Sequence, residues 1–462
     1  MDGTTHNKVF TPSGEPVPGE SLGQRIFGWF GKILPASFFA LLKQDLEIIE
    51  NSCIFILPVT TWLMIMQRLS QKGTLATAVS ELLQGNGREL PDPCKQVLEG
   101  RISANTGACS QARQRVPVEA ARRVAERTFE HLHALSRKGG LRDRVFLLDG
   151  SSIRLAHTPA ILKEYPPAEN QYGESHWPVM RIAVMHHVVT AVAMAPEFGP
   201  MYGPTAVSEQ GLSEALIGRL PPRSVLIADR NFGVFSVAWC AYSQGHAVVV
   251  RMTEARAKRL TGGDLNTGND RKVVWQPSRD DRRAHPELPA SARIEGRLIV
   301  ARPEGAEETL YLLTTLRQTA AEVVALYQER WQIETDLRSL KQQVRLETIP
   351  ARSPDLVATE LFIAVASYNP IRSVMAEAAE QIGIEPRRLS FSRSREAFWA
   401  FARAVANVDS SEKFEHHWRI LIRSLSQSRL PNRPRRSAPR VVWHKPQSFP
   451  TRKVQKNNAT KI

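Results

Sequence analysis

Residues 144–150 read RVFLLDG, a short apolar run that ends in an Asp-Gly pair. Such a run, bounded by turn-forming residues, is typical of a strand buried on both faces of a sheet. SVLIAD at 224–229 repeats the pattern, and HAVVVRM at 246–252 resumes it. Between the first two runs, VSEQGLSEALIGRL at 207–220 has helical spacing, and a short helix is expected from Phe232. This alternation predicts an α/β sheet.

The segments around these runs differ in composition. MRIAVMHHVVTAVAMAPEFG at 180–199 predicts further strands with hairpins, and the polar, basic stretch 253–316 predicts a β-rich insertion. A second long helix is expected at 356–381, with a kink at Pro370. The regions expected are a disordered tail at 1–20, an all-α part at 21–140, an α/β core at 141–382 with its insertion at about 253–316, and a helical, basic part at 383–462.

The net charge narrows the class of partner. The 462 residues include 61 Lys and Arg against 46 Asp and Glu, which gives a net charge of +15. This excess favours a polyanion, either nucleic acid or an anionic membrane surface. The tail after Glu415 has no acidic residue, so it is either an extended arm on a phosphate backbone or a solubilising segment. Arg122, Arg123 and Arg127 on a predicted helix are likewise either nucleic-acid contacts or solvated arginines.

The sequence gives no sign of secretion or of a membrane span. The start, MDGTTHNK, lacks the basic and then apolar pattern of a signal peptide. The most apolar run, residues 53–66, contains Pro58 and is shorter than the roughly 20 residues that a span requires, so we interpret it as a buried helical segment. The four cysteines are scattered without metal-site or disulfide spacing. A cytoplasmic protein with reduced thiols is expected.

A helix predicted over YQERWQIETDLRSLKQQVRL, residues 327–346, carries the most informative pattern, and Thr319 with Glu322 offers a capping box near its start. At about 100° per residue, a stripe roughly 60° wide contains Tyr327, Arg330, Glu334 and Lys341. The adjoining apolar face contains Leu326, Ile333, Leu337, Leu340 and Val344, and Glu329 and Asp336 are predicted to face water. Taken alone, Arg330 and Glu334 could simply be an i,i+4 surface pair.

Two further carboxylates change the interpretation of this stripe. Asp149 and Asp229 each end an apolar strand pattern, where active-site groups of open α/β sheets collect, although each could instead be a turn former. With Glu334 they make a set of hard oxygen ligands suited to divalent cations. Two such ions can activate a water or hydroxyl and stabilise the leaving oxygen during phosphodiester cleavage. Arg330 and Lys341 could then hold DNA phosphates.

The spacing Tyr327-x2-Arg330-x3-Glu334-x6-Lys341 resembles the Tyr-Arg-Glu-Lys signature of one large group of bacterial insertion-sequence DDE transposases. DGSS at 149 and ADRNFG at 229 are similar to that group's first and second Asp motifs, in the expected order. The match covers roughly residues 141–382. Soon after the first Asp motif, where the family has an acidic residue, this chain has SSIRLAHT with His157.

The resemblance implies a ribonuclease H-like catalytic core, interrupted by a β-rich insertion and flanked by an all-α DNA-binding domain and a helical, basic C-terminal region. It implies that Asp149, Asp229 and Glu334 bind two Mg²⁺ (or Mn²⁺) ions, and that Tyr327, Arg330 and Lys341 contact DNA. The reaction implied is cleavage at transposon inverted-repeat ends and joining of the 3′-hydroxyl to target DNA, by a homodimer on double-stranded DNA associated with the bacterial nucleoid.

Some assignments keep alternatives. Trp275 in RKVVWQ is a candidate to stack on a flipped base, or a packing residue of a strand. His186 and His187 are adjacent on a predicted strand, point to opposite faces and are interpreted as structural. For the whole chain, the alternatives are a DNA-binding derivative that has lost catalysis and a metal-dependent nuclease without strand transfer.

Overall fold

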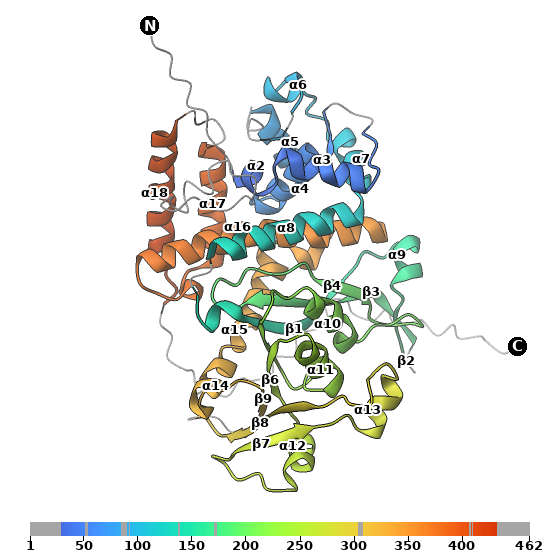
Figure 1. Ribbon diagram of the computed structural model, residues 1–462. Coiled ribbons are helices and arrows are strands. Elements are labelled where there is room, and N and C mark those ends of the chain that lie inside the picture. Colours follow the sequence, from blue (N-terminus) through green and yellow to red (C-terminus); the bar gives the residue numbers. More distant parts are fainter. Residues whose placement is uncertain are drawn as a thin grey trace, which may run out of the picture. The chain divides into compact units, whose positions relative to one another are not determined.

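A nine-stranded sheet forms the centre of the fold, in the order β2-β3-β1-β5-β6-β9-β8-β7, with β4 paired to β3 (Figure 1). The computed structural model describes residues 29–50, 54–84, 90–91, 93–136, 139–170, 173–303, 308–405, 408 and 410–431. The strands are β1 (Val145–Arg154), β2 (Pro167–Asn170), β3 (Gly173–His187), β4 (Glu197–Pro200), β5 (Val225–Ala228), β6 (Ala247–Arg251), β7 (Asp270–Trp275), β8 (Ile294–Ala301) and β9 (Leu310–Thr314).

The directions of these strands confirm the predicted α/β sheet. β1, β5 and β6 are parallel, whereas β3 is antiparallel to β1 and β4 is antiparallel to β3. The helices α10 (Glu209–Gly218) and α11 (Phe235–Ser243) lie in the connections that lead to β5 and β6. β5 is buried at every position, as its unbroken apolar sequence requires.

The polar stretch 253–316 contributes β7, β8 and β9, so its predicted β-rich character is confirmed. These strands extend the same sheet beyond β6, because β9 pairs with β6 and β8 pairs with β9. Two short helices accompany them, α12 (Glu254–Thr261) and α13 (Arg279–Ala284). The extension therefore begins beside β6, the neighbour of β5.

The described part of the chain before β1 contains helices and no strand. Its helices are α2 (Trp29–Ile33), α3 (Ala36–Asp45), α4 (Leu57–Leu69), α5 (Leu75–Leu83), α6 (Lys95–Leu98), α7 (Gly107–Gln114) and α8 (Val118–Ser136). Every residue of α4 is buried, which confirms the interpretation of the most apolar run as a buried helix. In the described ranges no helix is long and apolar enough to cross a bilayer.

After the sheet the chain is again helical. The helices after the last strand are α14 (Ala320–Gln328), α15 (Trp331–Arg338), α16 (Pro354–Gln381), α17 (Phe391–Val405) and α18 (Ser411–Gln427). One further short helix, α9 (Pro159–Glu164), lies between β1 and β2. Short 3₁₀ turns are η1 (Arg142–Arg144), η3 (Leu346–Thr348) and η4 (Pro386–Arg388), and η2 (Ser339–Gln343) is a π-helical segment. The predicted tail at 1–20 and the basic residues from 432 onwards lie outside the described residues.

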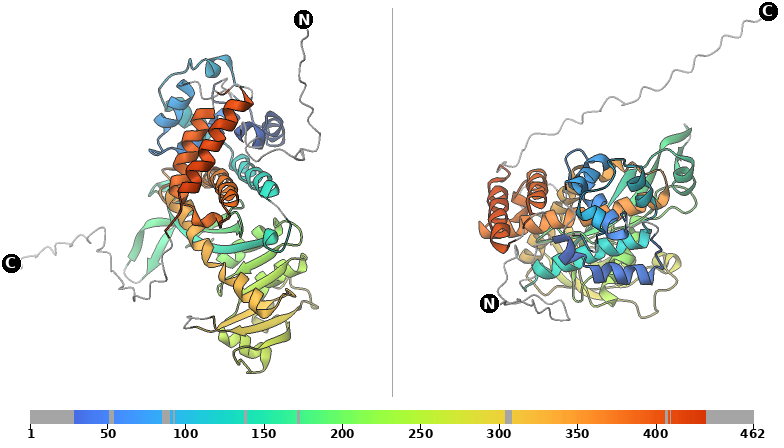
Figure 2. Two further views of the ribbon diagram at one scale, coloured as in Figure 1. Left: turned by 90° about the vertical axis from the view of Figure 1, so that its left-hand side faces the viewer. Right: turned by 90° about the horizontal axis from the view of Figure 1, so that it is seen from above.

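The helix α16 packs against α4, α8, α17 and α18. It is 28 residues long, includes Pro370 and is buried along most of its length. Figure 1 shows α8 running beside it, and Figure 2 shows α17 and α18 side by side. Buried charges fix this arrangement, because Glu360 of α16 accepts hydrogen bonds from Arg68 of α4 and Arg113 of α7.

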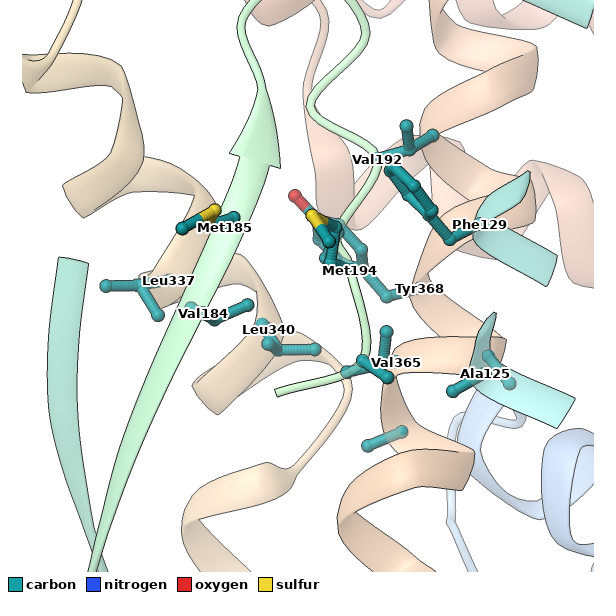
Figure 3. Close-up of a cluster of buried hydrophobic side chains, with 14 of the residues drawn as sticks. Ala125, Phe129, Val184, Met185, Val192, Met194, Leu337, Leu340, Val365 and Tyr368 are labelled. Carbon is teal, nitrogen blue, oxygen red and sulfur yellow. The ribbon is translucent and has the colours of Figure 1, made fainter. Parts of the chain in front are cut away.

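Side chains from several elements meet between the sheet and α16 (Figure 3). Leu337 of α15 and Leu340 of the π segment lie near Val184 and Met185 of β3 in Figure 3, and Tyr368 of α16 lies close by. Leu340 and Val184 are fully buried. This packing seats the helix that carries Glu334 on the sheet.

His186 and His187 mark the two faces of β3, as predicted. The His186 ring lies 5.7 Å from the Tyr368 ring of α16, and the His187 ring lies 4.8 Å from the His133 ring of α8. Both histidines are fully buried. Burial lowers the pKa of His186 to about 4 and that of His187 to about 3. Both are therefore neutral structural groups in the folded protein.

The buried histidines predict a pH-dependent stability. Above pH 6.5 both are neutral in the folded and unfolded chain, but as the pH falls below 6.5 only the unfolded chain gains their protons, so stability is lost towards pH 4. Each contributes a slope of up to about 1.4 kcal/mol per pH unit in this window. In urea unfolding between pH 6 and 5, His187→Gln should lower the wild-type slope by about that amount. An unchanged slope would contradict this, and His416→Gln on the exposed face of α18 is the control.

Candidate active site

Asp149 and Asp229 lie side by side at the centre of the sheet. Leu148 of β1 and Ala228 of β5 are the last pair of the parallel register between the two strands. Neighbouring strands are about 4.8 Å apart, so the residues that follow this pair emerge next to each other. β1 itself continues to Arg154, paired with β3. The prediction that Asp149 ends its strand is therefore wrong, although the parallel pairing does end there.

The two carboxylates repel each other in a partly dry environment. Burial is the main cause that raises the pKa of Asp149 to about 6, and the negative charge of Asp229 adds to it. A hydrogen bond from the Gly150 backbone N–H (2.8 Å) and the positive charge of Arg330 act in the opposite direction. Asp229 is oriented by the backbone N–H of Asn231, which donates to its Oδ1 at 2.8 Å.

A third acid, Glu209 at the start of α10, approaches this pair and was not found from the sequence. Asn231 Nδ2 donates to Glu209 Oε2 at 2.5 Å, and the negative charge of Glu209 also raises the pKa of Asp149. A Cβ on Gly150 would lie 2.4 Å from Glu209 Oε1. Gly150 therefore lies within a strand and leaves room for the Glu209 side chain, so its place differs from the turn that an Asp-Gly pair suggests.

The segment 320–346 is less regular than the single helix predicted for it. Its capping box is confirmed, because the Thr319 side chain accepts from the Glu322 N–H and Glu322 accepts from Thr319. However, α14 ends at Gln328 and α15 begins at Trp331, and the residues between them form i→i−3 hydrogen bonds. Such turns advance roughly 120° per residue instead of roughly 100°. Residues beyond the junction are therefore rotated by about 60–80° from the regular wheel.

The prediction for Asp336 is wrong because α16 and η4 cover the side of α15 that it occupies. Asp336 was expected in water but is fully buried, with ion pairs to Arg372 of α16 (2.8 Å) and to Arg387 (2.6 Å). Burial alone would raise its pKa, but the two arginines outweigh burial and lower it. Glu329 is also partly covered, with an ion pair to Arg142 at 2.7 Å. The predicted apolar face is confirmed, since Leu326, Ile333, Leu337, Leu340 and Val344 are all buried.

Three residues of the Tyr-Arg-Glu-Lys stripe lie close to the Asp pair or to one another. Arg330 is 14% exposed, lies 3.6 Å from a carboxylate oxygen of Glu334 and acts electrostatically on Asp149. Tyr327 is buried, which raises its pKa, and it is hydrogen bonded to Arg330. Glu334 is 44% exposed. Lys341 lies on the π segment, where its Nζ is 3.4 Å from Glu347 Oε1.

Other functional candidates are placed differently from the expectation. Trp275 is 7% exposed and packs edge to face on Phe235 at 5.3 Å, a placement that favours its packing role. Trp331, which follows Arg330, is 68% exposed. Arg251 follows Val250, the partner of Ala228, and so lies one strand from Asp229, and its charge acts on Tyr327. Nothing in the local sequence pattern distinguished Arg251 from other strand-end arginines.

Comparison with known proteins agrees with this geometry. Residues 140–369 match the family described as the transposase DDE domain. The chain is 27% identical over 355 residues to transposase InsG for insertion sequence element IS4 of Escherichia coli (strain K12), which covers 74% of this chain and 78% of the relative. Residues 140–369 therefore form a transposase DDE domain. It is also 26% identical over 182 residues to the putative transposase y4zB of Sinorhizobium fredii (strain NBRC 101917 / NGR234), covering 36% and 48% of the two chains. The predicted resemblance to insertion-sequence DDE transposases is confirmed.

The donor chemistry of the site suits the divalent metals that DDE transposases generally use. Mg²⁺ is commonly held by one or two carboxylates together with water and phosphate oxygens, and Asp149 with Asp229 supplies two carboxylates. A cation between them would also relieve the repulsion that raises the pKa of Asp149. Across the described ranges, however, no three Asp, Glu, His or Cys side chains are grouped as a metal cluster. Glu334 instead lies beside Arg330.

Because the pKa of Asp149 is raised in the folded protein, ionisation of this carboxyl destabilises the fold. Removing its charge should therefore stabilise the transposase. Below pH 3.8 the carboxyl is protonated in both folded and unfolded chains, whereas above pH 6 its ionisation opposes folding. Asp149→Asn should therefore raise the free energy of unfolding by about 1–3 kcal/mol at pH 7.5 in EDTA and by little at pH 4. Urea unfolding measures both, with Asp280→Asn at an exposed site as control. An equal effect at the two pH values would contradict the assignment.

Proposed function

We propose that this transposase binds transposon ends, cleaves DNA phosphodiester bonds there and joins the freed 3′-hydroxyl to target DNA with two Mg²⁺ or Mn²⁺ ions. The observation that carries the proposal is the register that brings Asp149 beside Asp229, with Arg330 close enough to act on the same carboxylate. Cations next to an acidic centre can receive DNA phosphates while the acids hold metal.

We assign the core to the ribonuclease H-like class. The support is the strand arrangement, in which β1, β5 and β6 are parallel and β3 and β4 continue antiparallel on the other side of β1. The first Asp motif lies within the central strand β1, the second follows β5, and the Glu334 helix α15 contacts β1. The strands β7–β9 correspond to the β-rich insertion between the second Asp and the Glu.

Each candidate residue has a distinct role in this proposal. Asp149, Asp229 and Glu334 hold the metal ions, which when bound activate a water or hydroxyl and stabilise the leaving oxygen. Arg330 donates to DNA phosphate beside the carboxylates, and its contact with Glu334 sets the separation of these two groups. Tyr327 holds Arg330 in place from its buried position. Lys341 contacts the same strand further along.

The substrate is double-stranded DNA, both as inverted-repeat ends and as target, and the active complex is a homodimer that holds two ends. The net charge of +15 supports a polyanionic partner. Arg122 forms an ion pair with Glu197 at 2.6 Å, and Arg123 pairs with Asp45 at 2.7 Å. These two arginines are therefore already paired within the protein. In the cell the DNA-bound protein is associated with the nucleoid.

A plasmid assay tests the proposal. With Mg²⁺ and a supercoiled plasmid that carries the element's inverted repeats, the full chain should cut at the repeat ends and join their 3′-hydroxyls to target DNA. Asp229→Ala and Glu334→Ala should each lower cleavage on the order of 10³-fold or more while end binding persists, because the acids serve the chemical step. Glu329→Ala, an acid of the same segment paired with Arg142, is the matched control and should retain cleavage.

The outcomes separate the proposal from its alternatives. End binding without any cleavage by the wild type would identify a derivative that has lost catalysis. Cleavage without joining would identify a nuclease. If Asp229→Ala or Glu334→Ala cuts at the wild-type rate, the assignment of the three acids is wrong.

A further inference from the structure

A basic cavity that none of the three candidate metal ligands lines lies where α4 meets the chain after the Glu334 helix. Its volume is about 260 Å³. The lining residues are Gln67, Arg68, Lys72, Gly73, Arg345 and Pro350. Three of these carry a positive charge and none carries a negative one. They come from α4, from the turn that follows it and from the chain just after the π segment.

The charges around this cavity are only partly balanced. Arg68 and Arg113 are both buried, and they share the single carboxylate of Glu360. Arg68 uses its remaining hydrogen bonds on the backbone carbonyls of Val344 (3.1 Å) and Arg345 (2.8 Å). The carbonyls at the end of the helical segment are thus capped by a residue of α4. Two arginines on one glutamate leave an excess positive charge behind the cavity wall.

Arg345 is held against the cavity by an unusual backbone. Its φ is 60°, in the left-handed region that residues with a side chain rarely adopt. Its guanidinium donates to the backbone carbonyl of Gln71. A Cβ on Gly73, which itself has φ 65°, would lie 1.4 Å from Arg345 Nη1. The guanidinium is the flexible end of its side chain, so glycine is favoured at position 73 by its positive φ and not by this contact.

Two other arginines, Arg68 and Arg395, lie close enough to Arg345 for their positive charges to interact with it. Burial first, and then the positive charge of Arg68, lowers the pKa of Arg345. Arg395 of α17 is 8% exposed, and its pKa is lowered by burial and by Arg345. In the part of the chain that the structure describes, the Nε of Arg395 has no hydrogen-bond partner. Lys72 is exposed at the rim. An anion in the cavity would offset this repulsion.

We propose that the cavity between Lys72 and Arg345 binds a phosphate group of the DNA backbone. The inference rests on the proposed function only in naming DNA as the source of the phosphate. Arg68 is paired with Glu360, but within the described residues Lys72 and Arg345 form no ion pair with a carboxylate, and a guanidinium beside an ammonium group is suited to phosphate oxygens. Because Arg68 also caps the segment after Lys341, a phosphate here connects the bound DNA to both α4 and the helix of the active site.

Salt-dependent binding tests this site without any cleavage. Full-length protein in EDTA is titrated into a fluorescent duplex that lacks transposon ends, and the dissociation constant is measured at several salt concentrations. Each phosphate contact that is lost lowers the slope of log affinity against log salt by about 0.9. Lys72→Gln and Arg345→Gln should each lower the slope by roughly this amount and weaken binding several-fold at low salt.

Matched variants separate charge from structure. Lys95→Gln removes an exposed lysine of α6 that pairs with Glu99, and it should leave the slope unchanged. Arg345→Lys keeps the charge without the guanidinium geometry and should restore most of the slope. Because Lys72 is exposed, its substitution is expected to leave folding intact, which keeps the test valid if Arg345→Gln fails to fold.

Unchanged slopes in both Lys72→Gln and Arg345→Gln would overturn the proposal. Inorganic phosphate provides the second arm: if millimolar phosphate stabilises the wild type against heat but the DNA slopes do not change, the cavity holds free phosphate and the assignment to DNA is wrong. Altered slopes in a protein that never cuts its ends would refute the proposed function and leave this site standing.

Discussion

The buried carboxylate of Asp336, held between Arg372 and Arg387, is the interaction on which the candidate active site depends. Asp336 lies two residues beyond Glu334 on α15, is fully buried and pairs with one arginine of α16 and one of η4. Arg387 also donates to the backbone carbonyl of Val188, just after β3. Removing one partner from such a buried network typically costs about 3–5 kcal/mol. The network therefore fixes the rotation of α15 against both the sheet and α16.

The sequence predicts some parts of this arrangement and not others. The strands β1, β5 and β6 could be predicted from their apolar runs, because a strand buried on both faces needs an unbroken apolar sequence. The apolar face of 326–344 is equally clear. A constant advance per residue, however, places Asp336 on the side of the helix away from Glu334 and predicts water there, whereas in the fold α16 and η4 bring Arg372 and Arg387 to that side. Glu209 was missed for a related reason, since its position depends on the packing of α10 against Gly150.

The electrostatics of the site follow from this arrangement. The sheet brings two acids together in a place where burial already penalises charge, and the protein offsets the repulsion with Arg330 and with backbone N–H groups. The ionised form of Asp149 remains unfavourable in the folded protein, and a bound divalent cation would stabilise it. Perturbed carboxyls next to a specific charge partner are typical of functional sites. In this transposase the same segment supplies Glu334 and Arg330, so the junction between α14 and α15 sets the positions of both side chains.

The most direct measurement of the central claim locates the metal ion itself. Fe²⁺ in place of Mg²⁺, with ascorbate and peroxide, generates hydroxyl radicals that cut the polypeptide backbone close to the ion. If Asp149, Asp229 and Glu334 hold the metal, the fragments should end near residues 149, 229 and 334, should diminish with excess Mg²⁺ and should be absent in Asp229→Ala. Cuts elsewhere, or cuts at these positions that persist in Asp229→Ala, would contradict the account.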